Sequence, residues 1–431
     1  MAGTTGATGV IGTVEERKIV IVGAGIAGLC CALELQAVGL PCLVLEASDV
    51  PGGRVRTDRV DGFQLDRGFQ VLLTAYPEAR RMLDFPALRL GTFAPGALVW
   101  TGGKLHRVAD PFRQPWALPA TLLAKVGSFG DKLRVTRLRR ETREGSLDDL
   151  FAKPEMTALE ALRRLYGFSE RMIETFFRPF LGGIFLEREL ATSSRMLDFV
   201  FRMFSLGKAA LPAAGMGAIP VQLAARLTAK AGAGALRLGA PVASLEDGGV
   251  RLKSGERIAA STVVLATAAG DATRLLPGLN TPLSRATACV YYAADRSPAV
   301  GRCLVLNGEE DGPVNNLCVP SNVARSYAPA GKALIAASVL GEERELTDPG
   351  LETAVRRQLT GWFGAEVAAW RHLRTDVVRD ALPARRSLEP ADLPARCRPG
   401  LYLCGDHRTT PSLQGAMASG RRAAEAIREA L

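Results

Sequence analysis

The sequence predicts an α/β protein, a Rossmann-like nucleotide-binding domain with a second, mixed α+β domain. Three observations support this prediction. An apolar, β-branched run, Ile19–Val22, leads into glycines spaced Gly-x-Gly-x-x-Gly and then into a helical pattern. A second apolar run, Cys42–Leu45, ends in Glu46. Near the other end of the chain, a third strand pattern leads through Gly405 and Asp406 into another helical pattern. The order strand, glycine turn, helix, strand and acid is typical of a domain that binds a dinucleotide.

Each glycine of the first turn has a physical role. Gly23 permits the tight turn, Gly25 lets the backbone approach a pyrophosphate, and Gly28 lets the helix pack closely on the strand. The helix N-terminus presents unpaired N–H groups and the positive end of its dipole to phosphates. The carboxylate of Glu46 can accept hydrogen bonds from ribose hydroxyls. We therefore expect nucleotide contacts from Gly23, Ala24, Gly25, Ile26, Ala27, Gly28, Glu46 and Ala47.

The composition is that of a large globular protein. The chain has 431 residues, 47% hydrophobic and 23% charged, which is enough for two or three domains. It contains no uncharged apolar stretch long enough to cross a membrane, and residues 1–14 are predicted to form a disordered tail. Its eight cysteines include no Cys-x-x-Cys pair, so free thiols and a cytoplasmic location are expected. Three histidines are too few for a multi-histidine site, and no metal is expected.

The net charge of +10 is concentrated in one segment. Residues 101–145 hold ten Lys/Arg against four Asp/Glu, and Lys132–Arg140 interleaves basic and apolar residues as an amphipathic helix does. The preceding stretch, 114–123, adds Trp116 and several leucines. Two interpretations stay open: a helix that packs its apolar stripe on its own domain, or peripheral contact with an anionic membrane surface. Nucleic acid is not expected as a partner, because no binding motif accompanies the charge.

A second group of motifs narrows the cofactor. Gly52, Gly53 and Arg54 form a turn with a guanidinium, which suits a pyrophosphate because it is permanently charged and binds two oxygens at once. The stretch 63–72 alternates as a strand does and contains Asp-Arg-Gly-Phe-Gln at 66–70. Gly400–Ile427 gives a strand, Gly-Asp, a loop and a glycine-containing helix. With these motifs the chain resembles the flavin amine oxidase superfamily, which also contains phytoene-type carotenoid desaturases and protoporphyrinogen oxidase.

The resemblance implies FAD bound noncovalently, since no cysteine stands in the family's covalent-flavin context. In that group the Gly-Gly-Arg turn contacts FAD, and the later glycine segment passes beside the flavin ring. The closing helix points its positive end at the flavin edge where negative charge gathers on reduction. The further cofactor contacts that the resemblance implies are Gly52, Gly53, Arg54, Gly68, Phe69, Gln70, Val242, Ala266, Thr267, Gly405, Asp406, Leu413, Gln414 and Ala416. Phe69, Gln70 and His407 are expected near the flavin, and no catalytic side chain is assigned because the flavin carries the chemistry.

The same resemblance implies a discontinuous FAD-binding domain. We predict that it comprises residues 15–90, 205–285 and 372–431, and that 91–204 and 286–371 form the substrate domain. Helical patterns cover 147–165 and 169–177, and 333–340 reads as a strand.

The expected reaction is removal of a hydride from a mostly apolar small molecule, with oxygen or a quinone as the electron acceptor. C–C dehydrogenation is slightly preferred over C–N oxidation, because the nearest basic residue after the strand 262–266 is Arg274, where the amine-oxidase branch usually has a lysine. Phe180, Phe185 and Tyr327 are predicted to line the substrate cavity. An amine oxidase, a flavin-dependent polyene isomerase and a non-catalytic FAD-binding protein remain as alternatives.

Overall fold

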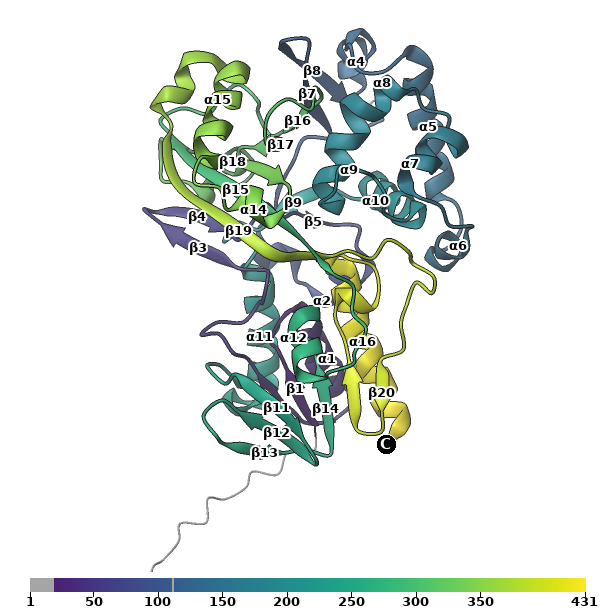
Figure 1. Cartoon of the computed structure of the whole chain (residues 1–431), viewed down its shortest axis with the longest axis vertical. Coiled ribbons are helices and arrows are strands. Elements are labelled where there is room, and N and C mark those ends of the chain that lie inside the picture. The colour runs from purple at the N-terminus through teal and green to yellow at the C-terminus, as the bar shows by residue number, and fades with distance from the viewer. Residues whose placement is uncertain (1–18, 111) are drawn as a thin grey trace, which may run out of the picture.

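A six-stranded sheet forms the core of the lower half of the molecule in the computed structural model, which describes residues 19–110 and 112–431 (Figure 1). The predicted tail at 1–14 lies outside the described residues. All neighbouring strands are parallel except β20 and β21. In sheet order, the strands are β10 (Leu236–Arg237), β2 (Cys42–Leu45), β1 (Ile19–Val22), β14 (Thr262–Leu265), β21 (Leu401–Leu403) and β20 (Arg396–Arg398).

Both faces of this sheet are covered, as expected for strands that are apolar throughout. Alternate side chains point to opposite faces: Ile19 and Ile21 pack with the helices on one side, while Val20 and Val22 pack with a small antiparallel sheet on the other. The helices are α1 (Ile26–Ala37), α11 (Ala218–Ala231) and α16 (Leu413–Ala430). The second face carries β11 (Val242–Glu246), β12 (Gly249–Leu252), β13 (Arg257–Ala259) and α12 (Ala269–Leu275). This arrangement confirms the predicted Rossmann-like fold.

A seven-stranded, mostly antiparallel sheet builds the second half of the molecule. In sheet order it contains β19 (Arg371–Pro383), β15 (Ser284–Ala294), β18 (Ala333–Leu340), β17 (Val314–Cys318), β16 (Leu304–Asn307), β7 (Gly96–Thr101) and β8 (Lys104–Ala109). One face packs on α15 (Leu351–Phe363), for instance through Val290 and Tyr292. The strand predicted at 333–340 coincides with β18. The boundary predicted at residue 372 differs from the topology, because β19 pairs with β15 and so extends this sheet.

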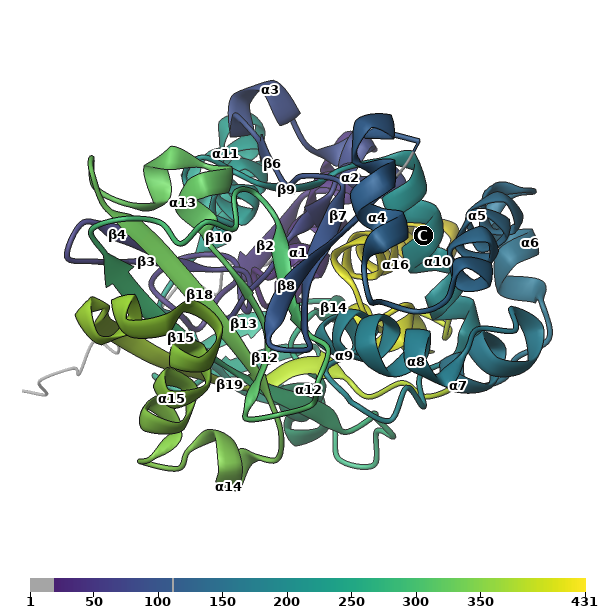
Figure 2. The ribbon, with the colours of Figure 1, turned by 90° about the horizontal axis from the view of Figure 1, so that it is seen from above.

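Beside this sheet, a lobe of short helices completes the upper half, as the view from above shows (Figure 2). The continuous helical pattern expected at 147–165 is interrupted after α6, because Pro154 removes a backbone donor and Thr157 caps a new helix. The helices are α4 (Leu118–Leu123), α5 (Phe129–Arg143), α6 (Leu147–Ala152), α7 (Ala158–Glu160), α8 (Glu170–Met172), α9 (Arg178–Phe185) and α10 (Ser194–Leu206).

The remaining elements are short. The strands are β3 (Thr57–Val60), β4 (Phe63–Asp66), β5 (Leu72–Leu73), β6 (Gly91–Thr92) and β9 (Ala209–Leu211), and the helices are α2 (Pro77–Met82), α3 (Phe85–Leu88), α13 (Pro320–Val323) and α14 (Glu343–Leu346).

Asp66, at the end of β4, forms hydrogen bonds with residues from both halves of the molecule. Its buried carboxylate accepts hydrogen bonds from the Thr57 hydroxyl at 2.5 Å, the Tyr327 hydroxyl at 2.7 Å and the Met216 N–H at 2.9 Å. Its backbone carbonyl accepts one from the Tyr291 hydroxyl at 2.5 Å. Burial raises the pKa of Asp66 to about 6, although the three donors oppose that shift. The β3–β4 hairpin is thereby held to the seven-stranded sheet and to the segment that re-enters the six-stranded one.

Candidate active site

One cavity of about 1800 Å³ runs from the six-stranded sheet to the seven-stranded sheet and the helical lobe. It begins where the parallel strands β1, β2 and β14 end, which is where open α/β sheets bind their ligands. Most of the residues predicted from sequence to touch the cofactor line this cavity, although they come from segments far apart in the chain. They are Gly23, Gly25, Ile26, Ala27, Glu46, Ala47, Gly52, Gly53, Arg54, Gly68, Phe69, Gln70, Val242, Ala266, Thr267, Gly405, Asp406, Leu413 and Ala416.

The glycine turn leaves a cradle beside the start of α1. A Cβ atom added to Gly25 would meet no protein atom within 4 Å, and because Gly25 lines the cavity, that atom would stand in the cavity. A Cβ on Gly28 would instead lie 2.0 Å from the carbonyl oxygen of Gly23, so this glycine serves the packing of helix on strand. Gly25 is also the N-cap of α1, whose first backbone N–H groups have no helical partner. The cradle therefore fits an anionic group such as a pyrophosphate.

Glu46 closes the nucleotide end of the cavity. Its carboxylate is almost fully buried and accepts hydrogen bonds from the N–H groups of Ala24, at 2.7 Å, and Ser48, at 2.9 Å. Ala24 does not line the cavity; its N–H instead fixes the orientation of the acid. A carboxylate with two donors still has lone pairs for a further hydrogen bond, and Glu46 borders the cavity.

Arg54 and Asp406 connect the two sequence signatures. The Arg54 guanidinium donates to Asp406 Oδ1 at 2.6 Å and to the carbonyl oxygen of Ala381 at 3.0 Å. Because Asp406 is buried and both side chains border the cavity, this charge-assisted pair forms part of its wall. Gln70 supports the turn, since its amide donates to the carbonyl oxygens of Arg54, at 2.9 Å, and Arg67, at 3.0 Å.

Besides Ala24, three predicted cofactor-side residues do not line the cavity. Gly28 faces the strand, as described. The amide oxygen of Gln414 accepts the Glu78 N–H at 2.9 Å, which turns this side chain toward α2. His407 is 1% exposed, and neither of its ring nitrogens has a hydrogen-bond partner among the described residues. Burial, aided by the positive charge of nearby arginines, lowers the pKa of His407 to about 4, so the ring is neutral at physiological pH.

One side of the outer part of the cavity is walled by apolar and aromatic side chains. Phe180, on α9, stacks on Phe176 with ring centroids 5.5 Å apart and meets Phe204 of α10 at 5.4 Å. Around them, the wall from α9, α10, β15, β17 and β18 contains no charged side chain. Its other members include Ile184, Met196, Val200, Phe201, Thr287, Asn316, Ser338 and Leu340.

Of the three residues predicted to line the substrate cavity, only one does so. Phe180 lines the cavity, but Phe185 and Tyr327 do not. Phe176, Phe180 and Ile184 follow one another at helical spacing of four and share a face, whereas Phe185 falls on the opposite, fully buried side. Tyr327 is engaged with Asp66 in the core between the two halves.

Comparison with known proteins identifies the family. The model of the flavin containing amine oxidoreductases matches residues 26–428. The chain belongs to this family. Among similar proteins, the lycopene-forming phytoene desaturase of Pseudescherichia vulneris is 31% identical over 183 residues, which cover 37% of this chain and 35% of that one. The phytoene dehydrogenase of Streptomyces griseus is 30% identical over 291 residues, or 61% of this chain and 54% of that one.

A solved oxidoreductase from Methanosarcina mazei shares the fold, with a TM-score of 0.74 at 18% identity over 96% of this chain and 100% of that one. The matched region spans between 16% and 35% of the length of the first curated relatives. Family membership makes this chain a flavin-dependent oxidoreductase. Its cradle at Gly25, its acid at Glu46 and its apolar outer cavity fit a flavin bound beside an apolar pocket.

Sequence reasoning missed several residues of the outer wall. Phe201 and Phe204 stand three residues apart on α10, a spacing that also puts two side chains on one helix face, and that periodicity could have found them. Asn316 and Ser338 could not be found in this way. They are cross-strand partners of β17 and β18, and the Asn316 amide donates to the Ser338 hydroxyl at 3.3 Å. Only the pairing of the strands brings these two polar side chains together on the wall.

Proposed function

We propose that this flavoprotein holds FAD without a covalent bond and dehydrogenates a carbon–carbon bond of a mostly apolar small molecule. The observation that supports this most is the uncharged aromatic wall of the outer cavity. Removing such a substrate from water is favourable by about 25 cal/mol for each Å² of apolar surface buried, while a charged substrate would lose hydration that this wall does not replace.

The nucleotide half would be held by residues at the ends of the parallel strands. Glu46 would accept from the ribose hydroxyls, the turn at Gly25 would receive the pyrophosphate, and Asp406 would face the ribityl chain. The N-terminus of α16, whose first turn carries no acidic residue, would stabilise negative charge at the flavin edge. Cys404 is fully buried in the core and does not line the cavity, consistent with a noncovalent cofactor.

The reaction requires the substrate to lose one hydride and one proton as a double bond forms. A bound flavin would supply the hydride acceptor, and oxygen or a quinone would take up the two electrons afterwards. The uncharged wall offers no titratable group for the proton, which would pass to water elsewhere in the cavity. The side chains of the wall therefore contribute position and exclusion of water rather than proton transfer.

C–N oxidation fits the same wall less well. An amine is a cation at neutral pH, so it needs either a free carboxylate that pairs with it or burial that lowers its pKa. Asp110, which lines the cavity, is already bound to Arg139 at 2.5 Å and lies 3.7 Å from Arg113. Arg274, where the amine-oxidase branch usually has a lysine, is an exposed residue at the cavity edge that lies near Asp271.

Two assays test the proposal. Acid precipitation should release FAD into the supernatant; a pellet that stays yellow, or release of FMN, would contradict noncovalent FAD. Aerobic turnover of carotenoid precursors or porphyrinogens should give products lighter by the mass of two hydrogens. Products that instead show oxidative loss of an amine would favour the amine oxidase.

A further inference from the structure

Exposed apolar side chains surround the opening of the cavity. Six large ones lie within 22 residues of each other in the chain and are between 40% and 82% exposed. All but Leu123 also line the cavity, and a side chain that both lines a cavity and meets solvent stands at its opening. We call this group the apolar rim: Phe112, Trp116, Leu122, Leu123, Phe129 and Leu133.

Four cations lie against the apolar rim. The Lys132 ammonium donates to the carbonyl oxygens of Leu122, at 2.7 Å, and Ala124, at 3.2 Å. The Arg171 guanidinium donates to the carbonyl oxygen of Lys125 at 3.0 Å. Lys104 lies two residues before His106 on β8, and His106 Nδ1 accepts the backbone N–H of Lys125 at 3.5 Å. The positive charges of Lys104, Lys125 and Arg171 accordingly add to the effect of burial in lowering the pKa of His106. Within the described residues, none of these four cations forms an ion pair with a carboxylate.

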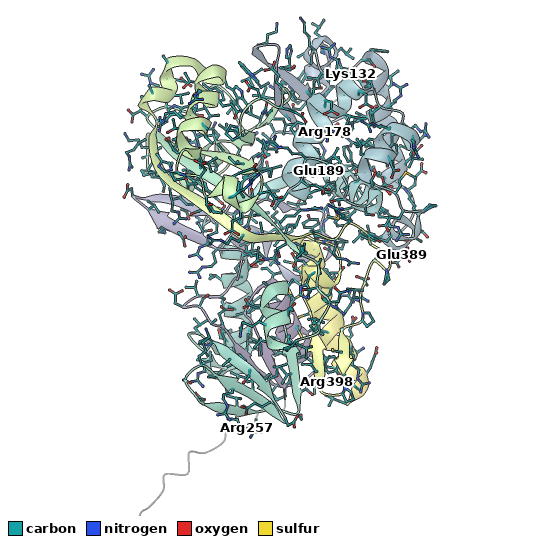
Figure 3. The ribbon with its side chains drawn as sticks, viewed as in Figure 1. Lys132, Arg178, Glu189, Arg257, Glu389 and Arg398 are labelled. Carbon is teal, nitrogen blue, oxygen red and sulfur yellow. The ribbon has the colours of Figure 1, made fainter. Side chains whose placement is uncertain are left out.

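The basic sequence segment contributes less free charge than its composition suggests. On α5, Arg137 pairs with Glu141 at 2.6 Å and Arg139 with Asp110 at 2.5 Å, while Arg134 lies 3.6 Å from Asp131. Among the described residues, most of the positive charge along α5 is therefore paired, Arg143 at its end being the exception, whereas the four cations at the rim are not. Figure 3 shows Lys132 at the end of the molecule opposite Arg257 and Arg398.

We propose that the apolar rim and its four cations dock on an anionic lipid bilayer, with the cavity opening facing the acyl chains. Apolar side chains beside unpaired cations match a surface in which hydrocarbon lies under negative headgroups. Among the described residues no helix is both long and apolar enough to cross a membrane, so the contact is peripheral. The inference rests on the proposed function in one respect: an apolar substrate would enter from the bilayer without passing through water.

Vesicle binding tests the docking without any turnover, so its failure is distinguishable from failure of the proposed reaction. The holoprotein should float with vesicles of phosphatidylcholine and phosphatidylglycerol and bind far more weakly to phosphatidylcholine alone. Replacing Lys104 and Lys125 by Gln should weaken binding roughly 25-fold, because each surface cation contributes about fivefold. The matched control replaces Lys230 and Arg398, exposed cations away from the rim, by Gln and should leave binding unchanged.

The apolar rim is tested in the same assay. Leu123→Ser should weaken binding about tenfold through lost apolar burial, whereas Leu283→Ser, at a leucine of similar exposure (84% against 82%) outside the rim, should not. Both variants should keep full flavin content, because neither residue lines the cavity.

Trp116 supplies a direct optical signal. It is 74% exposed, while Trp362 and Trp370 are buried and Trp100 is half-buried. Its fluorescence should shift to shorter wavelength on anionic vesicles, and Trp116→Phe should bind but lose the shift. No binding to anionic vesicles at low salt would overturn the proposal. So would a stable dimer in sedimentation that Leu123→Ser dissociates, since the rim would then be an interface between two copies.

Discussion

The buried ring of His407 should make the protein sensitive to mild acid. Burial lowers its pKa to about 4 from an ordinary value of 6.5. Between these values the unfolded chain binds a proton that the folded chain does not, so stability from His407 is fully present above pH 6.5 and is lost as the pH falls toward 4. The full effect of the shift is roughly 3 kcal/mol, and about 2 kcal/mol of it is lost near pH 5.

His407→Leu isolates this contribution. The ring nitrogens have no hydrogen-bond partner among the described residues, so leucine removes the titration without breaking a bond recorded there. The free energy of unfolding of both proteins can be measured with urea at about pH 8 and pH 5. On going to the lower pH, it should fall by about 2 kcal/mol more for the wild type than for the variant. His407→Gln, which also cannot titrate in this range, should reproduce the change. A difference that stays constant with pH would refute the reasoning, because His407 would then titrate alike in both states.

Three further predictions concern the cavity. Gly25→Val should abolish FAD loading, since its side chain would stand in the cradle, and a normally yellow variant would exclude that use of the turn. Glu46→Ala should weaken FAD binding by about 1.5–3 kcal/mol; calorimetry on the flavin-free protein measures this, and unchanged affinity would remove Glu46 from the ribose. Phe180→Ala should keep full FAD content but change the ratio of kcat/KM between bulky and slender substrates. Loss of FAD with an unchanged substrate preference would instead place Phe180 on the cofactor side of the cavity.

Local patterns were enough to predict the nucleotide end of the fold. The strands expected at Ile19–Val22 and Cys42–Leu45 coincide with β1 and β2, and the helix after Gly25 with α1. Each of these elements is specified within a few residues: β-branched runs favour strands, and a glycine turn fixes where a helix begins. The parallel sheet then brings the strand ends together, and with them the residues that line the inner cavity.

Features that depend on distant pairing could not be predicted in the same way. The Arg54–Asp406 pair joins residues 352 positions apart, and Asn316 meets Ser338 only through the register of β17 and β18. The aromatic character of Phe185 and Tyr327 suggests a cavity wall, yet an aromatic residue serves a core equally well. Composition does not say which face of a helix is buried, whereas the spacing of Phe176, Phe180 and Ile184 does.

The most direct test of the central claim is anaerobic reduction of the bound flavin by candidate substrates. Carotenoid precursors or porphyrinogens, supplied in detergent or vesicles, should bleach the oxidised flavin band in a single turnover, and simple primary amines should leave it unchanged. Bleaching by amines alone would contradict C–C dehydrogenation. Conversion of a polyene only after the flavin has been reduced beforehand, with no net oxidation, would identify an isomerase instead.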